Sequence, residues 1–215
     1  MVVSLFLYGL IVLALLMAEL KENERVQAII KPIAALGFIL LAIYFGALET
    51  KYGKIILAGL VVCAVGDVFL LSRKSETLFK AGMAAFAIGH ILYIIAFSNI
   101  KVISLPDDVD SIIGLGAVLP VLFGLYITKK TPKSMQRPVL YYCVIIYIMV
   151  FSSLLIPRTS PFIFATIAAI MFAISDMFVA RDRFITPNPK NALAITPLYF
   201  GAQALFALST QTLGA

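Results

Sequence analysis

Long runs of apolar residues, separated by short polar breaks, dominate this sequence. About twenty mostly apolar residues cross a bilayer as a helix, whereas strands of a membrane β-barrel would alternate apolar and polar residues. With 62% hydrophobic and 13% charged residues, the 215-residue chain leaves no room for a large water-soluble domain. We therefore predict an all-α, polytopic membrane protein whose residues 1–215 form one integral membrane domain. Its eight transmembrane helices should lie at about 2–18, 30–48, 55–71, 78–97, 111–128, 138–156, 161–180 and 194–213.

The basic residues between these runs indicate an orientation. Cytoplasmic connections of membrane proteins collect Lys and Arg. The first, third, fifth and seventh connections hold eleven of these residues, and the second, fourth and sixth hold four. We therefore expect a protein of the cell membrane with the odd connections in the cytoplasm and both termini outside it. The same rule accounts for the net charge of +6 without a nucleic-acid partner.

The two halves of the chain resemble each other at two places. GDVFL at 66–70 is echoed by SDMFV at 175–179, and KP at 31–32 is echoed by RP at 137–138. This pattern favours a four-plus-four duplication. Four crossings return the chain to its starting side, so the halves would run parallel and the two aspartates would lie at equal depth.

Ionisable side chains inside the predicted spans are functional candidates, because each costs several kcal/mol in lipid unless it is shielded. Asp67 lies six residues before Arg73 and Asp176 lies five before Arg181. At 1.5 Å per residue, both are about 8 to 9 Å below the interface, too deep for a short side chain to reach it. We expect both carboxyls to face protein or a water-filled cavity. The full set inside the spans is Lys31, Asp67, Lys80, His90 and Asp176.

Each of these residues also has a purely structural interpretation. A buried Asp can clamp neighbouring helices by bonding to Lys31 or Lys80, and His90 can donate to a carbonyl group in the core. Both lysines lie close enough to the interface to extend their ammonium groups into it. Two structural clamps have no need to occur at matched depth in similar sequence, which favours a functional role for Asp67 and Asp176.

The inventory of reactive side chains limits the chemistry. The sequence offers only Cys63, Cys143 and a single His as usual zinc ligands, which does not favour a zinc site. It has neither a G-x-S-x-G elbow nor a glycine-rich phosphate loop. A carboxylate pair with a histidine remains. In a site of low dielectric, one carboxyl tends to be protonated and the other ionised, giving an acid and a base. We predict catalytic roles for Asp67, Asp176 and His90.

Four motifs carry a resemblance to a known family. They are GDVFLL at 66–71, F-x-x-G-x-x-x-F-x-x-G-H-x-x-Y at 79–93, F-x-x-S-D at 172–176 with Phe184, and Y-x-x-x-Q at 199–203. Together they run through nearly the whole chain and resemble the YhhN family, which includes the lysoplasmalogenases. The KP pair at 31–32 also fits this pattern.

The resemblance implies hydrolysis of the vinyl ether bond of a lysoplasmalogen, a lysophospholipid within the membrane. The products would be a fatty aldehyde and a glycerophospho-ethanolamine or glycerophospho-choline. Protonation of the β-carbon gives an oxocarbenium ion that water captures, and the resulting hemiacetal collapses. This reaction needs an acid, a base and a placed water, and it requires no cofactor and no metal. Asp67 and Asp176 can supply the acid and the base. For substrate binding we expect Lys31, Lys80 and Arg137 to hold the lipid phosphate, with further contacts from Tyr93, Tyr199 and Gln203.

Two other interpretations stay open at this stage. Paired intramembrane Asp residues and a parallel repeat are equally natural in a proton-coupled transporter or lipid carrier. A different membrane lipid hydrolase could instead hold a metal between Asp67, Asp176 and His90.

Overall fold

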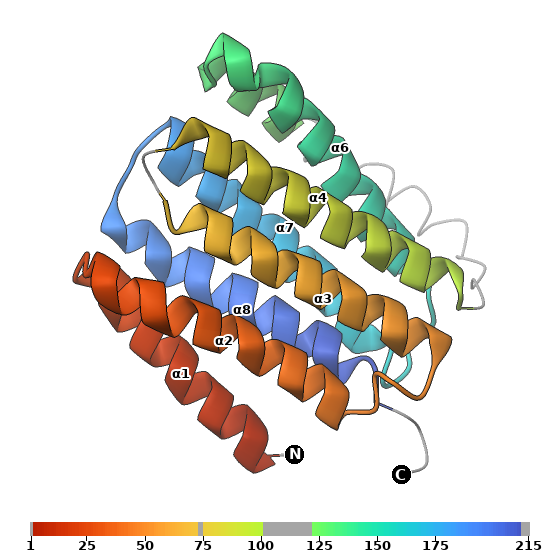
Figure 1. The fold of residues 1–215 in the computed structure, drawn as a ribbon. Helices are drawn as coiled ribbons and strands as arrows, with labels where there is room; N and C mark the ends of the chain where they lie inside the picture. Colours follow the sequence, from red (N-terminus) through yellow and green to blue (C-terminus); the bar gives the residue numbers. More distant parts are fainter. Residues whose placement is uncertain (1, 73–74, 101–121, 212–215) are drawn as a thin grey trace.

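The computed structural model describes residues 2–72, 75–100 and 122–211. These residues are helical apart from short connections (Figure 1). Within these ranges, seven helices are long and apolar enough to cross a membrane, which confirms an all-α, polytopic membrane protein. The predicted fifth span, 111–128, lies mostly outside the described residues. Residues 122–130, which include the end of this span, are helical. The helices are α1 (Val2–Leu20), α2 (Glu24–Tyr44), α3 (Lys51–Leu70), α4 (Glu76–Ser98), α6 (Lys133–Leu154), α7 (Ile163–Phe184) and α8 (Ala192–Leu208), with the short 3-10 helix η1 (Pro189–Asn191) before α8.

Polar caps make several helices longer than the apolar runs that predicted them. The Asn23 side chain accepts a hydrogen bond from the backbone N–H of Val26 at 3.2 Å, and Thr50 accepts one from Gly53 at 2.9 Å. Such caps satisfy N–H groups that have no partner within the helix. Helix α2 therefore begins six residues before the predicted span, and Pro32 lies inside it rather than at its start.

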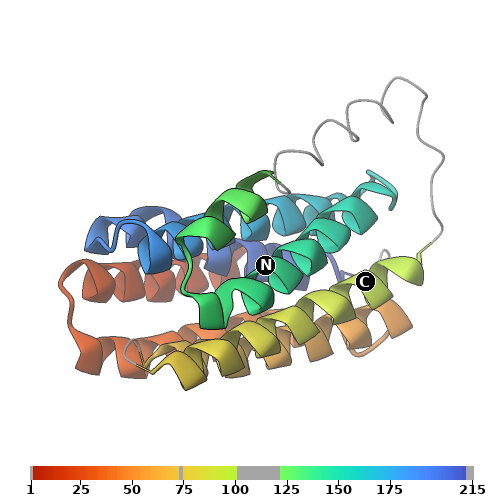
Figure 2. The same cartoon turned by 90° about the horizontal axis from the view of Figure 1, so that it is seen from above.

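The helices run side by side along one bundle axis. Helix α3 packs along α4, and α7 packs along α8, with the two pairs on opposite sides of the bundle in Figure 2. Helix α2 contacts α8, and α4 contacts α6. In a parallel four-plus-four arrangement these two contacts are equivalent to each other. The duplication itself stays a prediction.

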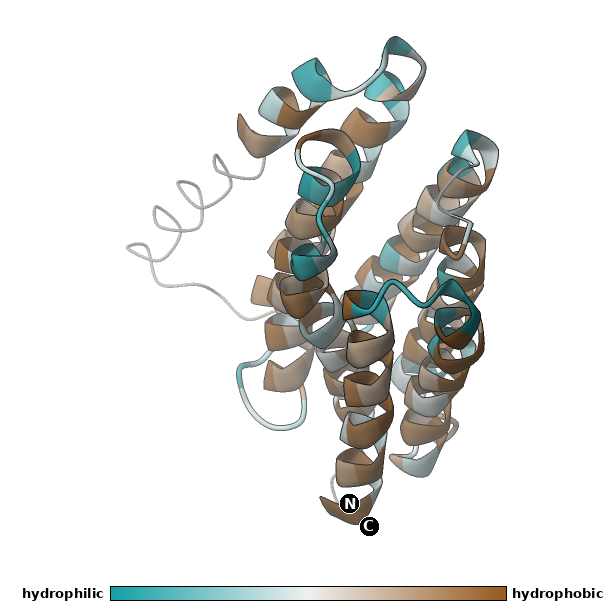
Figure 3. Cartoon of the chain, turned by 90° about the vertical axis from the view of Figure 1, so that its left-hand side faces the viewer, coloured by the Kyte–Doolittle hydropathy of each residue, from teal (hydrophilic) through white to brown (hydrophobic). Residues whose placement is uncertain are grey.

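Apolar side chains cover the outside of the bundle as well as its interior. Large hydrophobic residues such as Phe6, Ile29 and Leu40 are more than half exposed. Figure 3 shows apolar residues along the helices and polar residues gathered near the helix ends. An apolar exterior of this extent is typical of a surface that contacts lipid.

Glycines let α3 and α4 approach closely. A Cβ atom on Gly59 would lie 2.4 Å from the Tyr93 ring, and one on Gly89 would lie 2.5 Å from the Cys63 sulfur. Small residues at such contacts let membrane helices pack backbone against backbone. This packing fixes the rotation of α3 and α4 relative to each other, and with it the direction of Asp67.

Candidate active site

Asp67 of α3 and Asp176 of α7 line the same cavity, which has a volume of about 140 Å³. Helices α2, α4, α6 and α8 and residue Phe123 complete its wall. Besides the two carboxyls, its polar lining residues are Lys31, Tyr142, Ser175 and Tyr199. The rest of the wall is apolar: Leu70, Phe79, Met83, Phe86, Phe123, Val139, Cys143, Ile146, Ala173, Met177, Val179, Ala180, Phe184 and Ile195.

The Asp67 carboxylate has a partner at each oxygen. Tyr199 donates its hydroxyl to Oδ2 at 2.5 Å, and the Lys31 ammonium lies 3.5 Å from Oδ1. The side chain is only 2% exposed. A neighbouring cation and a donated hydrogen bond both favour the ionised form of a carboxyl group. The ion pair that sequence reasoning considered as a helix clamp is thus present, at a carboxylate that also faces the cavity.

A chain of hydrogen bonds continues behind Tyr199, away from the cavity. Gln203 donates its amide to the Tyr199 hydroxyl at 3.1 Å, and Tyr93 donates to the Gln203 amide oxygen at 2.9 Å. Both Tyr93 and Gln203 are fully buried and neither lines the cavity. Of the three residues predicted to complete the substrate site, only Tyr199 reaches the cavity, and the other two hold Tyr199 in place.

Asp176 has different neighbours. Tyr142 of α6 donates its hydroxyl to Oδ2 at 2.8 Å. Within the described residues, no Lys or Arg pairs with this carboxyl. The adjacent Ser175 donates to the carbonyl of Ile195 at 3.2 Å, which ties this turn of α7 to α8. In the part of the chain that the structure describes, Asp176 therefore has one oxygen held by a phenol and no cation to favour ionisation.

Sequence reasoning missed Tyr142. A tyrosine in an apolar span is usually read as a core or interfacial side chain, because most of its surface is apolar. Its spacing on α6 shows only which face it occupies. The contact with Asp176 arises from the packing of α6 against α7.

His90 does not line the cavity. Its ring is fully buried, packs edge-on against Phe172 at 4.5 Å between ring centroids, and lies 5.6 Å from the Tyr142 ring. Within the described part of the chain, neither ring nitrogen has a hydrogen-bond partner. His90 is thus set behind the aromatic rings rather than beside the two carboxyls.

The predicted phosphate ligands are not brought together. Lys31 lines the cavity but pairs with Asp67. The Lys80 ammonium lies 2.7 Å from Glu76 of the same helix, and Arg137 is exposed. Neither Lys80 nor Arg137 is part of the cavity wall.

The sequence profile of the YhhN family matches residues 26–210 of the chain. The chain belongs to the YhhN family. The matched range includes both cavity carboxyls and every residue that hydrogen-bonds to them.

Curated relatives carry the name lysoplasmalogenase. The chain is 31% identical to lysoplasmalogenase TMEM86A of Bos taurus over 196 residues, which cover 86% of this chain and 78% of the relative. It is 30% identical to lysoplasmalogenase TMEM86B of Homo sapiens over 168 residues, covering 74% and 64%. It is 28% identical to lysoplasmalogenase TMEM86B of Mus musculus, covering 91% and 80%. No solved structure matches this YhhN protein.

Proposed function

We propose that this YhhN protein is a lysoplasmalogenase that hydrolyses the vinyl ether bond of a lysoplasmalogen within the membrane. The products are a fatty aldehyde and a glycerophospho-ethanolamine or glycerophospho-choline. The observation that carries the proposal is the presence of two carboxyls, Asp67 and Asp176, in one mostly apolar cavity. The similarity to relatives named lysoplasmalogenase supports it.

The environments of the two carboxyls suggest different roles. Asp67 has a lysine and a phenol to stabilise its negative charge, so we assign it as the base. Asp176 has only the Tyr142 phenol among the described residues, so it can hold a proton in the apolar cavity and we assign it as the acid. A pair of carboxyls in unlike environments is a recurring way to obtain both functions at one pH.

The reaction then proceeds with these two groups alone. Asp176 transfers its proton to the β-carbon of the vinyl ether, which leaves an oxocarbenium ion on the neighbouring carbon. Asp67 removes a proton from the attacking water, and a hemiacetal forms. The hemiacetal hydroxyl returns its proton to Asp176 while Asp67 protonates the departing glycerol oxygen. The carbon–oxygen bond breaks, the aldehyde leaves, and both carboxyls regain their starting forms.

Aldehyde release from purified protein tests this proposal. We expect aldehyde from 1-alkenyl lysophospholipids and no product from the saturated 1-alkyl analogue, which cannot form the oxocarbenium ion by protonation of a double bond. The 1-acyl lysophospholipid separates bond types, because ester hydrolysis would release a fatty acid. Fatty acid release without aldehyde would contradict the proposal.

A proton-coupled transporter or lipid carrier is the second candidate. The contacts of α2 with α8 and of α4 with α6 favour it, because a parallel four-plus-four repeat would make them equivalent and such repeats are common in transporters. Proton-dependent lipid flux in liposomes, without aldehyde release, would support this alternative.

The metal-dependent alternative needs Asp67, Asp176 and His90 to converge. Phe172 and Tyr142 lie against His90, and His90 is not in the cavity wall. Over the described ranges, no three His, Cys, Asp or Glu residues are grouped closely enough to hold a metal ion. The arrangement of these side chains therefore favours the two carboxyls acting alone.

A further inference from the structure

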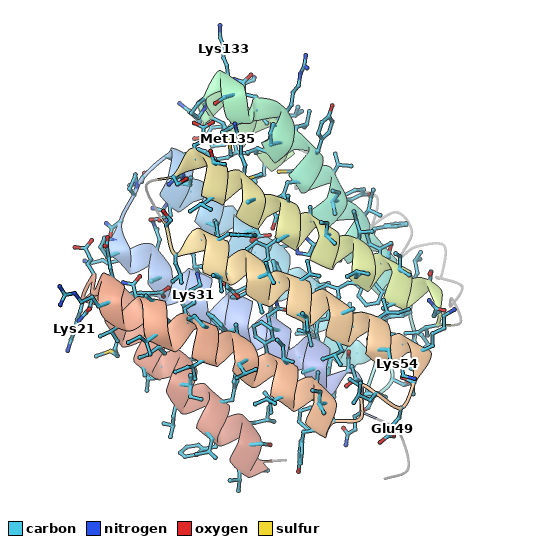
Figure 4. All side chains as sticks on the ribbon, in the orientation of Figure 1. Lys21, Lys31, Glu49, Lys54, Lys133 and Met135 are labelled. Carbon is cyan, nitrogen blue, oxygen red and sulfur yellow. The ribbon has the colours of Figure 1, made fainter. Side chains whose placement is uncertain are left out.

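A second cavity adjoins the one that holds the two carboxyls. Its lining residues are Glu76, Phe79, Lys130, Pro132, Met135, Arg183 and Phe184. Phe79 and Phe184 also line the first cavity, so these two aromatic residues form a shared wall. Met135 marks the second cavity in Figure 4, at the end of the bundle where Lys21 and Lys133 lie and opposite the end with Glu49 and Lys54.

The wall of this second cavity carries a surplus of positive charge. Lys130 and Arg183 contribute two cations. Glu76, the one acidic residue among the described residues of the wall, has its charge offset by Lys80 at 2.7 Å and accepts a hydrogen bond from Ser134 at 2.9 Å. An anion in this cavity would therefore meet Lys130 and Arg183 with the charge of Glu76 already compensated.

Arg183 is held at the boundary between the two cavities. Its guanidinium carbon lies 4.5 Å from the centroid of the Phe79 ring, a cation–π contact. Phe79 in turn packs edge-on against Phe184, with 6.0 Å between the ring centroids. Arginine presents a planar fork of N–H donors that matches a phosphate group.

The separation from the carboxyls fits a glycerophospholipid. Arg183 follows Asp176 by seven residues on α7, which places their backbones about 10 Å apart along the helix axis. Five bonds join the phosphorus of a lysophospholipid to its sn-1 ether oxygen, an extended length of about 6 Å from ordinary bond lengths. A charge-assisted hydrogen bond adds about 3 Å at the phosphate. A phosphate at Arg183 would thus bring the ether bond level with Asp176.

We propose that Lys130 and Arg183 bind the phosphate of the lysophospholipid headgroup, while the alkenyl chain passes Phe79 and Phe184 into the cavity of Asp67 and Asp176. This inference rests on the proposed function, since it takes the lysolipid as substrate. It replaces Lys80 and Arg137, which sequence reasoning selected, with two cations that share a cavity. The phosphate would bind as a monoanionic diester, the state shared by the ethanolamine and choline headgroups.

Binding of a non-hydrolysable ligand tests the site independently of catalysis. The probes are 1-O-alkyl-glycerophosphoethanolamine and 1-O-alkylglycerol, which differ only in the phosphoryl headgroup, titrated into the full chain in nanodiscs. Lys130→Gln and Arg183→Gln should each weaken binding of the phospholipid roughly ten-fold or more, and should change binding of the alkylglycerol less than about two-fold. Lys129→Gln and Arg181→Gln are the matched controls, because these neighbouring cations do not line the cavity and should leave both affinities unchanged.

The opposite results would overturn the assignment. Unchanged phospholipid affinity in both variants, or equal losses for the two probes, would show that Lys130 and Arg183 do not bind the phosphate. Inorganic phosphate is a further probe. If the two Gln variants lose affinity for inorganic phosphate but keep their affinity for the phospholipid, the site binds a free anion instead of a headgroup. Arg183→Lys, which keeps the charge, should retain more affinity than Arg183→Gln and serves if the latter fails to fold. If Lys130→Gln and Arg183→Gln lose phospholipid binding but the unmodified protein never releases aldehyde, the phosphate site is supported and the proposed function is refuted.

Discussion

The hydroxyl of Tyr199 donates a hydrogen bond to Asp67 across 132 residues of sequence, and so joins α8 to α3 at the wall of the cavity. Gln203 and Tyr93 hold that hydroxyl from behind. The bond orients one carboxylate oxygen and stabilises its charge. It makes Tyr199 a positioning residue for Asp67 as well as a part of the cavity wall.

Tyr199→Phe should lower kcat by roughly ten-fold or more, because a hydrogen bond to a charged group contributes about 1.5 to 3 kcal/mol. KM for the lysolipid should change less. Steady-state aldehyde release measures both constants. Tyr52→Phe is the matched control, since this buried tyrosine bonds to Ser209 at 2.8 Å away from the cavity and its loss should leave kcat unaltered. A Tyr199→Phe enzyme with unchanged kcat would contradict a positioning role.

Lys31→Met should reduce kcat more than it raises KM, because the Lys31 ammonium pairs with the Asp67 carboxylate. The phosphate-binding role expected from the sequence would instead raise KM more than it lowers kcat. The ratio of the two effects therefore distinguishes an ion-pair role from a phosphate-binding role. Lys80→Met removes a partly exposed pair with Glu76, and we expect it to alter kcat by less than about two-fold, as for most surface ion pairs.

His90→Gln should have a mild effect on kcat, within about three-fold, because His90 lies behind Phe172 and Tyr142 and does not line the cavity. A general acid or base contributes about 100-fold or more. If His90→Gln lost activity on that scale while remaining folded, His90 would have to donate the proton, and the assignment of Asp176 as the acid would be wrong.

Gly89→Ala should destabilise the folded protein by about 1 to 3 kcal/mol, because its new Cβ on α4 would lie 2.5 Å from the Cys63 sulfur of α3. Gly9→Ala is the control: nothing lies within 4 Å of the position that its new methyl group would occupy, so the stability of this variant should be unchanged or slightly higher. Thermal unfolding of the two variants in the same detergent provides the comparison. Equal melting temperatures would contradict the tight contact.

The sequence predicts the helical membrane fold and the matched pair of aspartates because both depend on local information. Apolar runs indicate spans, and the distance from Asp67 or Asp176 to the next arginine indicates depth. Helix ends are less predictable, because caps such as Asn23 and Thr50 extend helices beyond the apolar run.

The partners of the two carboxyls depend on helix rotation and on contacts between distant helices, which sequence periodicity does not determine. Tyr142 looks like any aromatic residue of an apolar span, yet it bonds to Asp176. His90 looks like the strongest catalytic candidate after the aspartates, yet α4 directs it toward Phe172. Lys130 and Arg183 lie in different polar breaks of the sequence, and only the fold brings them to one cavity.

Aldehyde release by the Asn variants of Asp67 and Asp176 tests most directly whether the two carboxyls act together on a vinyl ether. Asp67→Asn and Asp176→Asn should each lower kcat about 100-fold or more, and the double variant should be little worse than either, because residues that act as a unit are not additive. Glu49→Gln, which changes a carboxyl at the opposite end of the bundle, should retain full activity. Near-wild-type aldehyde release from both folded Asn variants would contradict the carboxylate-pair mechanism.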